Sequence, residues 1–92
     1  MLERDVVNAA RKYAKSKGVR SVRNCFRPGV NVGFPDETFL IPGGRPLIVE
    51  FKAPGKKPTP KQRLEIQRLK EEGYDVEVCD SLESFKTALD RA

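Results

Sequence analysis

Two acids and a lysine occupy positions from which they could act together on a phosphate. Asp36 directly precedes a run typical of a strand, residues 37–41, and Glu50 and Lys52 lie on one face of a second run, residues 46–52. The intervening Pro-Gly-Gly-Arg predicts a turn, so the two runs form a hairpin. Folding the hairpin brings Asp36 close to Glu50 across the ladder, in a register that the turn type sets.

These three side chains suit the hydrolysis of phosphodiesters. Two carboxylates at one point repel each other and raise each other's pKa unless a cation lies between them. Mg²⁺ prefers carboxylate oxygens with room for water and phosphate, and it can polarise a phosphoryl oxygen and lower the pKa of a bound water. Lys52 would orient the attacking water or offset the developing charge. The alternative is an ordinary Glu-x-Lys pair on a solvated strand face.

The rest of the chain predicts the elements that must hold this hairpin. The expected elements are a helix over residues 1–17, a strand over 19–27, the two hairpin strands, a helix from Pro60 to about Glu72, a strand over Tyr74–Cys79 and a final helix capped by Asp80 or Ser81. Thr59 is the expected N-cap of the middle helix, and Gly73 is expected to end it. A helix between two strands indicates a crossover and therefore a mixed α/β architecture.

Several motifs together resemble a known nuclease family. Pro35-Asp36 followed by Glu50-Phe51-Lys52 is similar to the PD-(D/E)XK nuclease signature. With Gly33-Phe34 before it and Thr59-Pro60-Lys61-Gln62 after it, the pattern resembles the VRR-Nuc (virus-type replication-repair nuclease) domain. The resemblance covers nearly the whole chain, through Val76-Glu77-Val78-Cys79.

This resemblance implies a divalent-metal-dependent phosphodiesterase. The implied fold is a single α/β domain over residues 1–92, a PD-(D/E)XK core in the order α-β-β-β-α-β-α with a central mixed four-stranded sheet flanked by helices. Asp36, Glu50 and the backbone carbonyl of Phe51 would hold Mg²⁺ or Mn²⁺. Small stand-alone members of the family resemble homodimeric resolvases of branched DNA, whereas larger repair nucleases carry the domain as one module.

Glu3 and Gln62 each have two interpretations. Glu3 lies within the apolar stripe of the first helix, where an acid needs a partner. It is either a third acid near the metal site, as the resemblance implies, or a solvated residue of a frayed first turn. Gln62 completes a capping box with Thr59, and the resemblance also implies that it reaches the active site. Both roles of Gln62 can hold at once.

Basic residues surround the predicted site. The candidates for contact with a phosphate backbone are Arg23, Arg27, Lys56, Lys57, Lys61 and Arg63. Arg23 and Arg27 belong to the predicted first strand, and Lys56 and Lys57 to a proline-rich loop after Lys52. The alternative for each of them is a solvated surface position.

Composition limits the remaining possibilities. The 92 residues carry a net charge of +5, which favours a polyanionic partner, and their small core makes an oligomer reasonable. With no histidine and two distant cysteines, a Cys/His zinc site is excluded and a reducing compartment is expected. No apolar run has transmembrane length and the glycines lack phosphate-loop spacing, so neither a membrane nor a nucleotide cofactor is expected. We expect a cytoplasmic protein of a bacterium, or of a phage inside its host.

The sequence therefore predicts a Mg²⁺- or Mn²⁺-dependent DNA endonuclease that is selective for branched DNA and acts as a homodimer. Asp36, Glu50, Lys52, Gln62 and Glu3 are its predicted catalytic residues. One alternative is a nuclease that acts on flaps, nicks or linear duplex. The other is a basic DNA-binding module in which the acids have no catalytic role.

Overall fold

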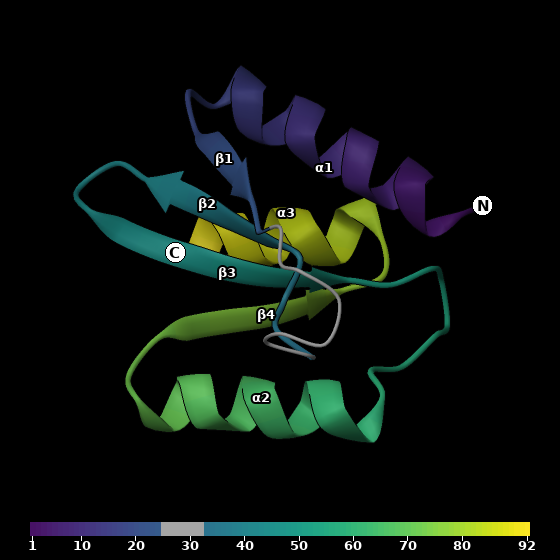
Figure 1. Ribbon diagram of the computed structural model, residues 1–92. Helices are drawn as coiled ribbons and strands as arrows, with labels where there is room; N and C mark the ends of the chain where they lie inside the picture. Colours follow the sequence, from purple (N-terminus) through teal and green to yellow (C-terminus); the bar gives the residue numbers. More distant parts are fainter. Residues whose placement is uncertain (25–32) are drawn as a thin grey trace.

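The computed structural model describes residues 1–24 and 33–92 and has the predicted order α-β-β-β-α-β-α (Figure 1). The elements are α1 (Glu3–Ser16), β1 (Arg20–Arg23), β2 (Glu37–Ile41), β3 (Arg45–Phe51), α2 (Pro60–Glu71), β4 (Asp75–Cys79) and α3 (Leu82–Arg91). The first strand is shorter than the predicted 19–27, and residues 25–27 of that prediction lie outside the described residues. The α/β fold class predicted from the sequence is confirmed.

The four strands form one mixed sheet in the order β1-β2-β3-β4. The first three strands pair antiparallel, whereas β4 returns through the α2 crossover to pair parallel with β3. Glu37 stands opposite Val49 in the hairpin ladder. Continued by one residue, this register would place Asp36 opposite Glu50, which agrees with the predicted closeness of the two acids.

Helices cover both faces of the sheet, and each face has its own apolar cluster. In Figure 1, α1 and α3 lie on one side of the sheet and α2 lies alone on the other. The α1/α3 side holds the larger cluster, which includes Phe39, Phe51 and Phe85. The α2 side holds Ile48, Ile66, Leu69 and Val76, with Phe34 packed against them. Because strand side chains alternate, β3 contributes Leu47, Val49 and Phe51 to the first face and Ile48 and Glu50 to the second.

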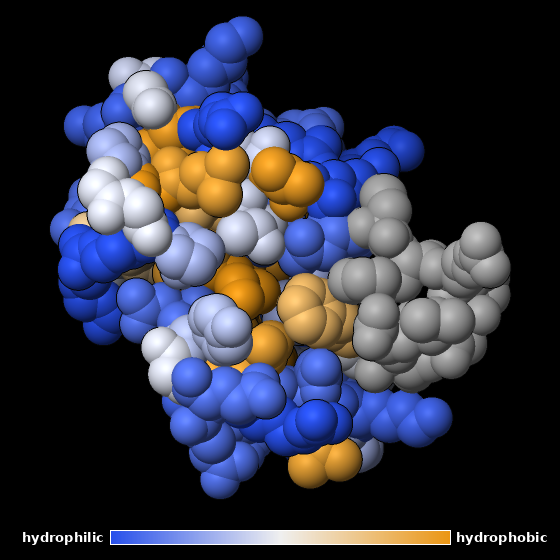
Figure 2. Space-filling view, turned by 60° about the vertical axis from the view of Figure 1, so that its left-hand side comes forward, coloured by the Kyte–Doolittle hydropathy of each residue, from blue (hydrophilic) through white to orange (hydrophobic). Residues whose placement is uncertain are grey.

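Local signals set the ends of the helices next to the sheet. Thr59 caps α2 by accepting a hydrogen bond from the Gln62 N–H, and Pro60 occupies the first turn. Ser81 caps α3 in the same way. Gly73 follows α2 with φ at 96°, a conformation that glycine adopts without strain. Figure 2 shows hydrophilic residues over the top and bottom of the molecule, where α1 and α2 lie, with hydrophobic residues gathered between them.

Candidate active site

The backbone before Asp36 is held from two sides. Gly33 has φ at 89°, and a Cβ atom there would lie 2.8 Å from the carbonyl oxygen of Lys61, so only glycine allows this approach to α2. On the other side, Asn24 donates its backbone N–H to the Asp36 carbonyl at 2.8 Å and its side-chain amide to the Pro35 carbonyl at 3.0 Å. Asp36 therefore enters the sheet in a fixed orientation.

The Asp36 carboxylate points at the end of β3. Its Oδ2 accepts a hydrogen bond from the backbone N–H of Phe51 at 3.0 Å. Burial raises the pKa of Asp36, and the Phe51 N–H and the Lys52 charge only partly oppose that shift. Asp36 is thus a partly desolvated carboxylate that a further positive charge would stabilise.

Glu50 is the more buried of the two acids, with 1% of its surface exposed. Its Oε2 accepts a hydrogen bond from Gln62 Nε2 at 3.1 Å and lies 3.4 Å from Lys52 Nζ. Its Oε1 is buried and has no hydrogen-bond partner among the described residues. Burial, followed by the charge of Asp36, raises the pKa of Glu50 to about 7.

Gln62 makes the contacts that both of its interpretations require, although its part in catalysis stays a prediction. Its side-chain Oε1 accepts a hydrogen bond from the Thr59 N–H at 2.8 Å, which completes the capping box. Its Nε2 donates to Glu50. Because the capping box fixes the side chain, the first turn of α2 aligns one oxygen of Glu50.

The donor set fits a hard divalent cation. Asp36, just before β2, and Glu50 on β3 supply two carboxylates, and Glu50 Oε1 is a buried acceptor without a donor in the part of the chain that the structure describes. That part holds no group of three or more His, Cys, Asp or Glu residues that could bind a metal. Two carboxylates suffice for Mg²⁺ or Mn²⁺, because these ions keep several water ligands and also bind substrate phosphate. Phe51, the expected backbone ligand, is the last residue of β3.

Glu3 lies in solvent at the rim of the site. It is exposed and, with Asp36, lines an open hollow of about 310 Å³ beneath α1. Its negative charge is the smallest cause of the raised pKa of Glu50, after burial and Asp36. Glu3 is therefore solvated but belongs to the helix and not to a frayed turn, and its role as a third acid near a metal site stays a prediction.

A partly buried ion pair beside the site was not predicted from the sequence. Glu37, 2% exposed, accepts hydrogen bonds from Arg11 Nε at 2.9 Å and from Arg11 Nη2 at 2.6 Å. The hydrogen bond to Glu37 raises the pKa of Arg11. The alternation of side chains along β2 could have indicated that Glu37 is buried, because Glu37 shares its face with the core residue Phe39.

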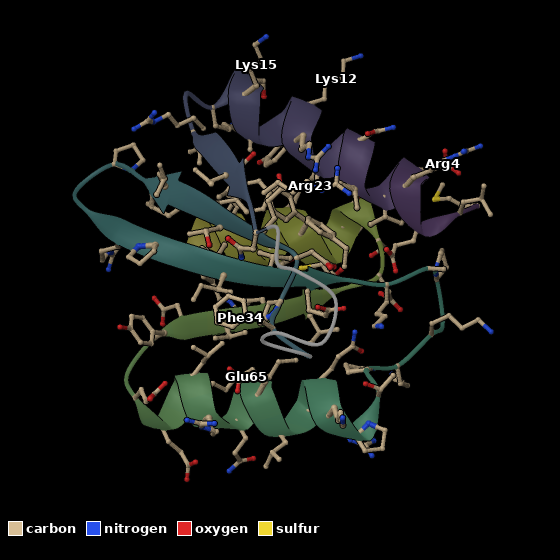
Figure 3. The ribbon with its side chains drawn as sticks, in the orientation of Figure 1. Arg4, Lys12, Lys15, Arg23, Phe34 and Glu65 are labelled. Carbon is tan, nitrogen blue, oxygen red and sulfur yellow. The ribbon has the colours of Figure 1, made fainter. Side chains whose placement is uncertain are left out.

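The basic residues predicted to contact DNA lie on two sides of the carboxylates. Lys56 and Lys57 are exposed in the loop between β3 and α2. Lys61 and Arg63 are exposed on the first turn of α2. Arg23 is exposed at the end of β1, opposite Glu37, and lies beneath α1 in Figure 3. Arg27 lies outside the described residues.

The fold and this arrangement define a domain of the PD-(D/E)XK type. The VRR-NUC domain family model matches residues 3–83, and the chain belongs to that family. A solved VRR_NUC domain is similar with a TM-score of 0.83 and 25% sequence identity, over 96% of this chain and 94% of the solved one.

A relative from a phage carries a nuclease name. The protein "Putative nuclease p44" of Acyrthosiphon pisum secondary endosymbiont phage 1 is 49% identical over 49 residues. The match covers 53% of each protein, so this chain spans about half the length of that relative. Family membership and this name support a nuclease.

Among the described residues, no helix combines the length and apolar character needed to cross a membrane.

Proposed function

We propose that the chain is a divalent-metal-dependent DNA endonuclease whose active site is the Asp36, Glu50 and Lys52 cluster. The observation that carries the proposal is the environment of Glu50. One of its oxygens is engaged by Gln62 and Lys52, while the other is buried without a donor among the described residues. A buried carboxylate kept in this way is costly for folding and is typical of a ligand site.

Each residue has a distinct role in hydrolysis. Asp36, Glu50 and the Phe51 carbonyl would hold Mg²⁺ or Mn²⁺, which when bound polarises phosphoryl oxygens and lowers the pKa of water in the site. Lys52 orients the attacking water or offsets the negative charge that develops on the phosphate. Gln62 keeps Glu50 aligned through the bond to Oε2. Glu3 supports the cluster from the rim of the hollow.

The surrounding charges favour a nucleic-acid substrate. The chain carries a net charge of +5, although its central site is acidic. Lys56, Lys57, Lys61 and Arg63 are exposed on the segment that joins Lys52 to α2 and on the start of that helix. Salt-sensitive contacts of these residues with phosphates would position DNA over the acids.

The proposed substrate is branched DNA, and the proposed active form is a homodimer. This part of the proposal rests on the resemblance to small family members that resemble resolvases of branched DNA. A symmetric dimer would place two copies of the site on opposing strands of a four-way junction. We place the activity in the cytoplasm, bacterial or of a phage-infected host.

Cleavage of a labelled four-way junction tests the site. Wild type, with Mg²⁺ or Mn²⁺, is compared with Asp36→Asn and Lys52→Ala, and with Asp75→Asn and Lys70→Ala as matched exposed controls. We expect cleavage by wild type and both controls and none by the two site variants. Equal residual cutting by all five proteins would assign the activity to a contaminant. Binding without cleavage under every condition would favour the DNA-binding module.

A substrate panel and a mass measurement test the finer claims. The panel contains the junction, a flap, a nicked duplex and a linear duplex of the same arm sequence. Paired symmetric nicks in the junction, with little cutting of the linear duplex, are expected. Equal cleavage of the linear duplex would remove the junction claim. Light scattering of the protein as it elutes from a size-exclusion column should give twice the mass of one chain. A monomer that still makes paired cuts would contradict the proposed homodimer.

A further inference from the structure

Two neighbouring hollows between α1 and the edge strand β1 share Arg11 as a lining residue. The hollow of about 310 Å³ contains Glu3 and Asp36. A second hollow of about 390 Å³ lies between the end of α1 and the start of β1 and contains Lys15 and Arg20. Arg11 lines both hollows. We name the two hollows together the α1–β1 groove, with Lys15 at one end and Asp36 at the other.

Charge is divided along the α1–β1 groove. Among the described residues that line the hollow farther from Asp36, the ionisable ones are Arg11, Lys15 and Arg20, and none is acidic. The acids of the groove all line the hollow that contains Asp36. The groove is therefore positive at its Lys15 end, and its acids are confined to the end that contains Asp36, where Arg11 and Arg23 also line it. This polarity suits a phosphate backbone that runs toward a metal-binding centre.

Arg11 is held in a conformation that suits anion binding. Its Nε and Nη2 donate to Glu37, and no described residue accepts a hydrogen bond from Nη1. The side chain is 39% exposed, so the guanidinium is fixed on one edge and open to the groove on another. An ordered guanidinium loses less entropy than a free one when it binds phosphate. Figure 3 shows Lys15 extending from α1 and Arg23 beneath the same helix.

We propose that the α1–β1 groove binds the phosphodiester backbone of DNA on the side of the cleaved bond opposite the Lys56–Lys57 loop. This inference rests on the proposed nuclease function and adds Arg11 and Lys15 to its substrate contacts. Because α1 and α2 cover opposite faces of the sheet, basic side chains then flank the carboxylates on both sides. β1 has four residues. Its length of roughly 13 Å matches about four nucleotides at an axial rise of 3.4 Å each.

Charge reversal at Lys15 tests the groove. Lys15→Glu is compared with Lys70→Glu, because both lysines are exposed and lie in the last turn of a helix, so reversal disturbs the two helix dipoles alike. The probe is a fluorescein-labelled four-way junction, with binding followed by anisotropy in EDTA over a series of salt concentrations. Lys15→Glu should weaken binding at least about 5-fold and lower the salt slope by about 0.9, the share of one phosphate contact. Lys70→Glu should change affinity less than about 2-fold.

A milder variant, thermal unfolding and cleavage kinetics complete the test of Lys15. Lys15→Gln, with the midpoint of thermal unfolding measured for all variants, replaces Lys15→Glu if the latter does not fold. In cleavage assays, the groove variant should raise KM and leave kcat unchanged, since Lys15 does not reach the carboxylates. Equal losses of affinity in the Lys15 and Lys70 variants would contradict the proposal that the α1–β1 groove binds DNA. If Lys15→Glu alone lost affinity but the wild-type chain never cleaved DNA, the groove would stand as a DNA-binding site and the proposed nuclease function would be refuted.

Discussion

The two buried glutamates of this domain, Glu37 and Glu50, lie on adjacent strands and have opposite environments. Glu37 faces α1 and receives a two-pronged set of hydrogen bonds from Arg11. Glu50 faces α2, has one oxygen engaged and one without a donor among the described residues, and has a pKa raised to about 7. The two acids are almost equally inaccessible to solvent, at 2% and 1%.

The difference separates a carboxylate that is paired within the fold from one that we propose binds a metal ion. A buried acid that is matched by a guanidinium fork is satisfied within the fold. A buried acid that keeps an unpaired oxygen beside a second carboxylate lowers stability until a cation binds. Burial by itself therefore does not distinguish the two glutamates, whereas the completeness of their hydrogen bonding does, and it supports the proposed role of Glu50.

The largest expected effect comes from replacing each glutamate by glutamine. Glu50→Gln should reduce cleavage at least about 100-fold, the scale on which loss of one electrostatic catalytic group slows enzymes. Its free energy of unfolding should not fall, because an uncharged amide avoids the desolvation of the carboxylate. Glu37→Gln should lower the free energy of unfolding, and it should reduce cleavage much less than Glu50→Gln does. Initial cleavage rates and urea unfolding measure both, and a reversal of the two phenotypes would contradict the comparison.

The pH dependence of stability should reveal Glu50 directly. Since the pKa of Glu50 is higher in the folded state than its ordinary value of 4.5, the folded state binds more protons between pH 4.5 and about 7. The metal-free protein should therefore lose stability as pH rises through that window, by of order 3 kcal/mol. The raised pKa of Asp36 acts in the same direction. Urea unfolding in EDTA at several pH values measures this loss.

Two controls sharpen the pH experiment. Glu50→Gln should flatten the decline, because the titrating group is gone. Addition of Mn²⁺ at neutral pH should raise the unfolding midpoint of wild type but not of the variant. A decline of equal size in Glu50→Gln would assign it to other groups.

Breaking the ion pair at Arg11 should act on stability first. Arg11→Ala leaves Glu37 buried without its partner, which should cost about 2 kcal/mol, less than for a fully buried pair because Arg11 is partly exposed. The double variant Arg11→Met with Glu37→Leu should recover much of the loss, since apolar residues can replace a buried pair. Urea unfolding of the single and double variants measures this recovery. If the double variant were less stable than Arg11→Ala, the pair would have a role beyond satisfying Glu37.

The smallest expected effect separates the two roles of Gln62. Gln62 and Ser84 occupy the same position in the capping boxes of α2 and α3. Gln62→Ala and Ser84→Ala should each lower stability by about 0.5–1 kcal/mol. Only Gln62→Ala should also slow cleavage, by about 10-fold, because Glu50 loses its aligning donor. Equal cleavage rates in the two variants would show that Gln62 caps α2 and has no role in cleavage.

Local patterns in the sequence were sufficient for much of this site. The turn at Gly43-Gly44 and the alternation of side chains along both strands predicted that Asp36 would stand near Glu50, and the ladder confirms it. Thr59 and Pro60 predicted the start of α2, and with it the position of Gln62. These features are encoded within short stretches of chain, because a turn and a cap depend on few neighbouring residues.

Contacts between distant elements were decided only by the tertiary structure. The pairing of Arg11 with Glu37 joins residues 26 positions apart and depends on how α1 packs across β2. The α1–β1 groove and the exposed position of Glu3 at its rim depend on the same packing. The sequence determined which carboxylates meet at the hairpin, since register follows from local geometry. Only the packed fold decided which buried glutamate is neutralised, because that requires a side chain from another layer of the structure.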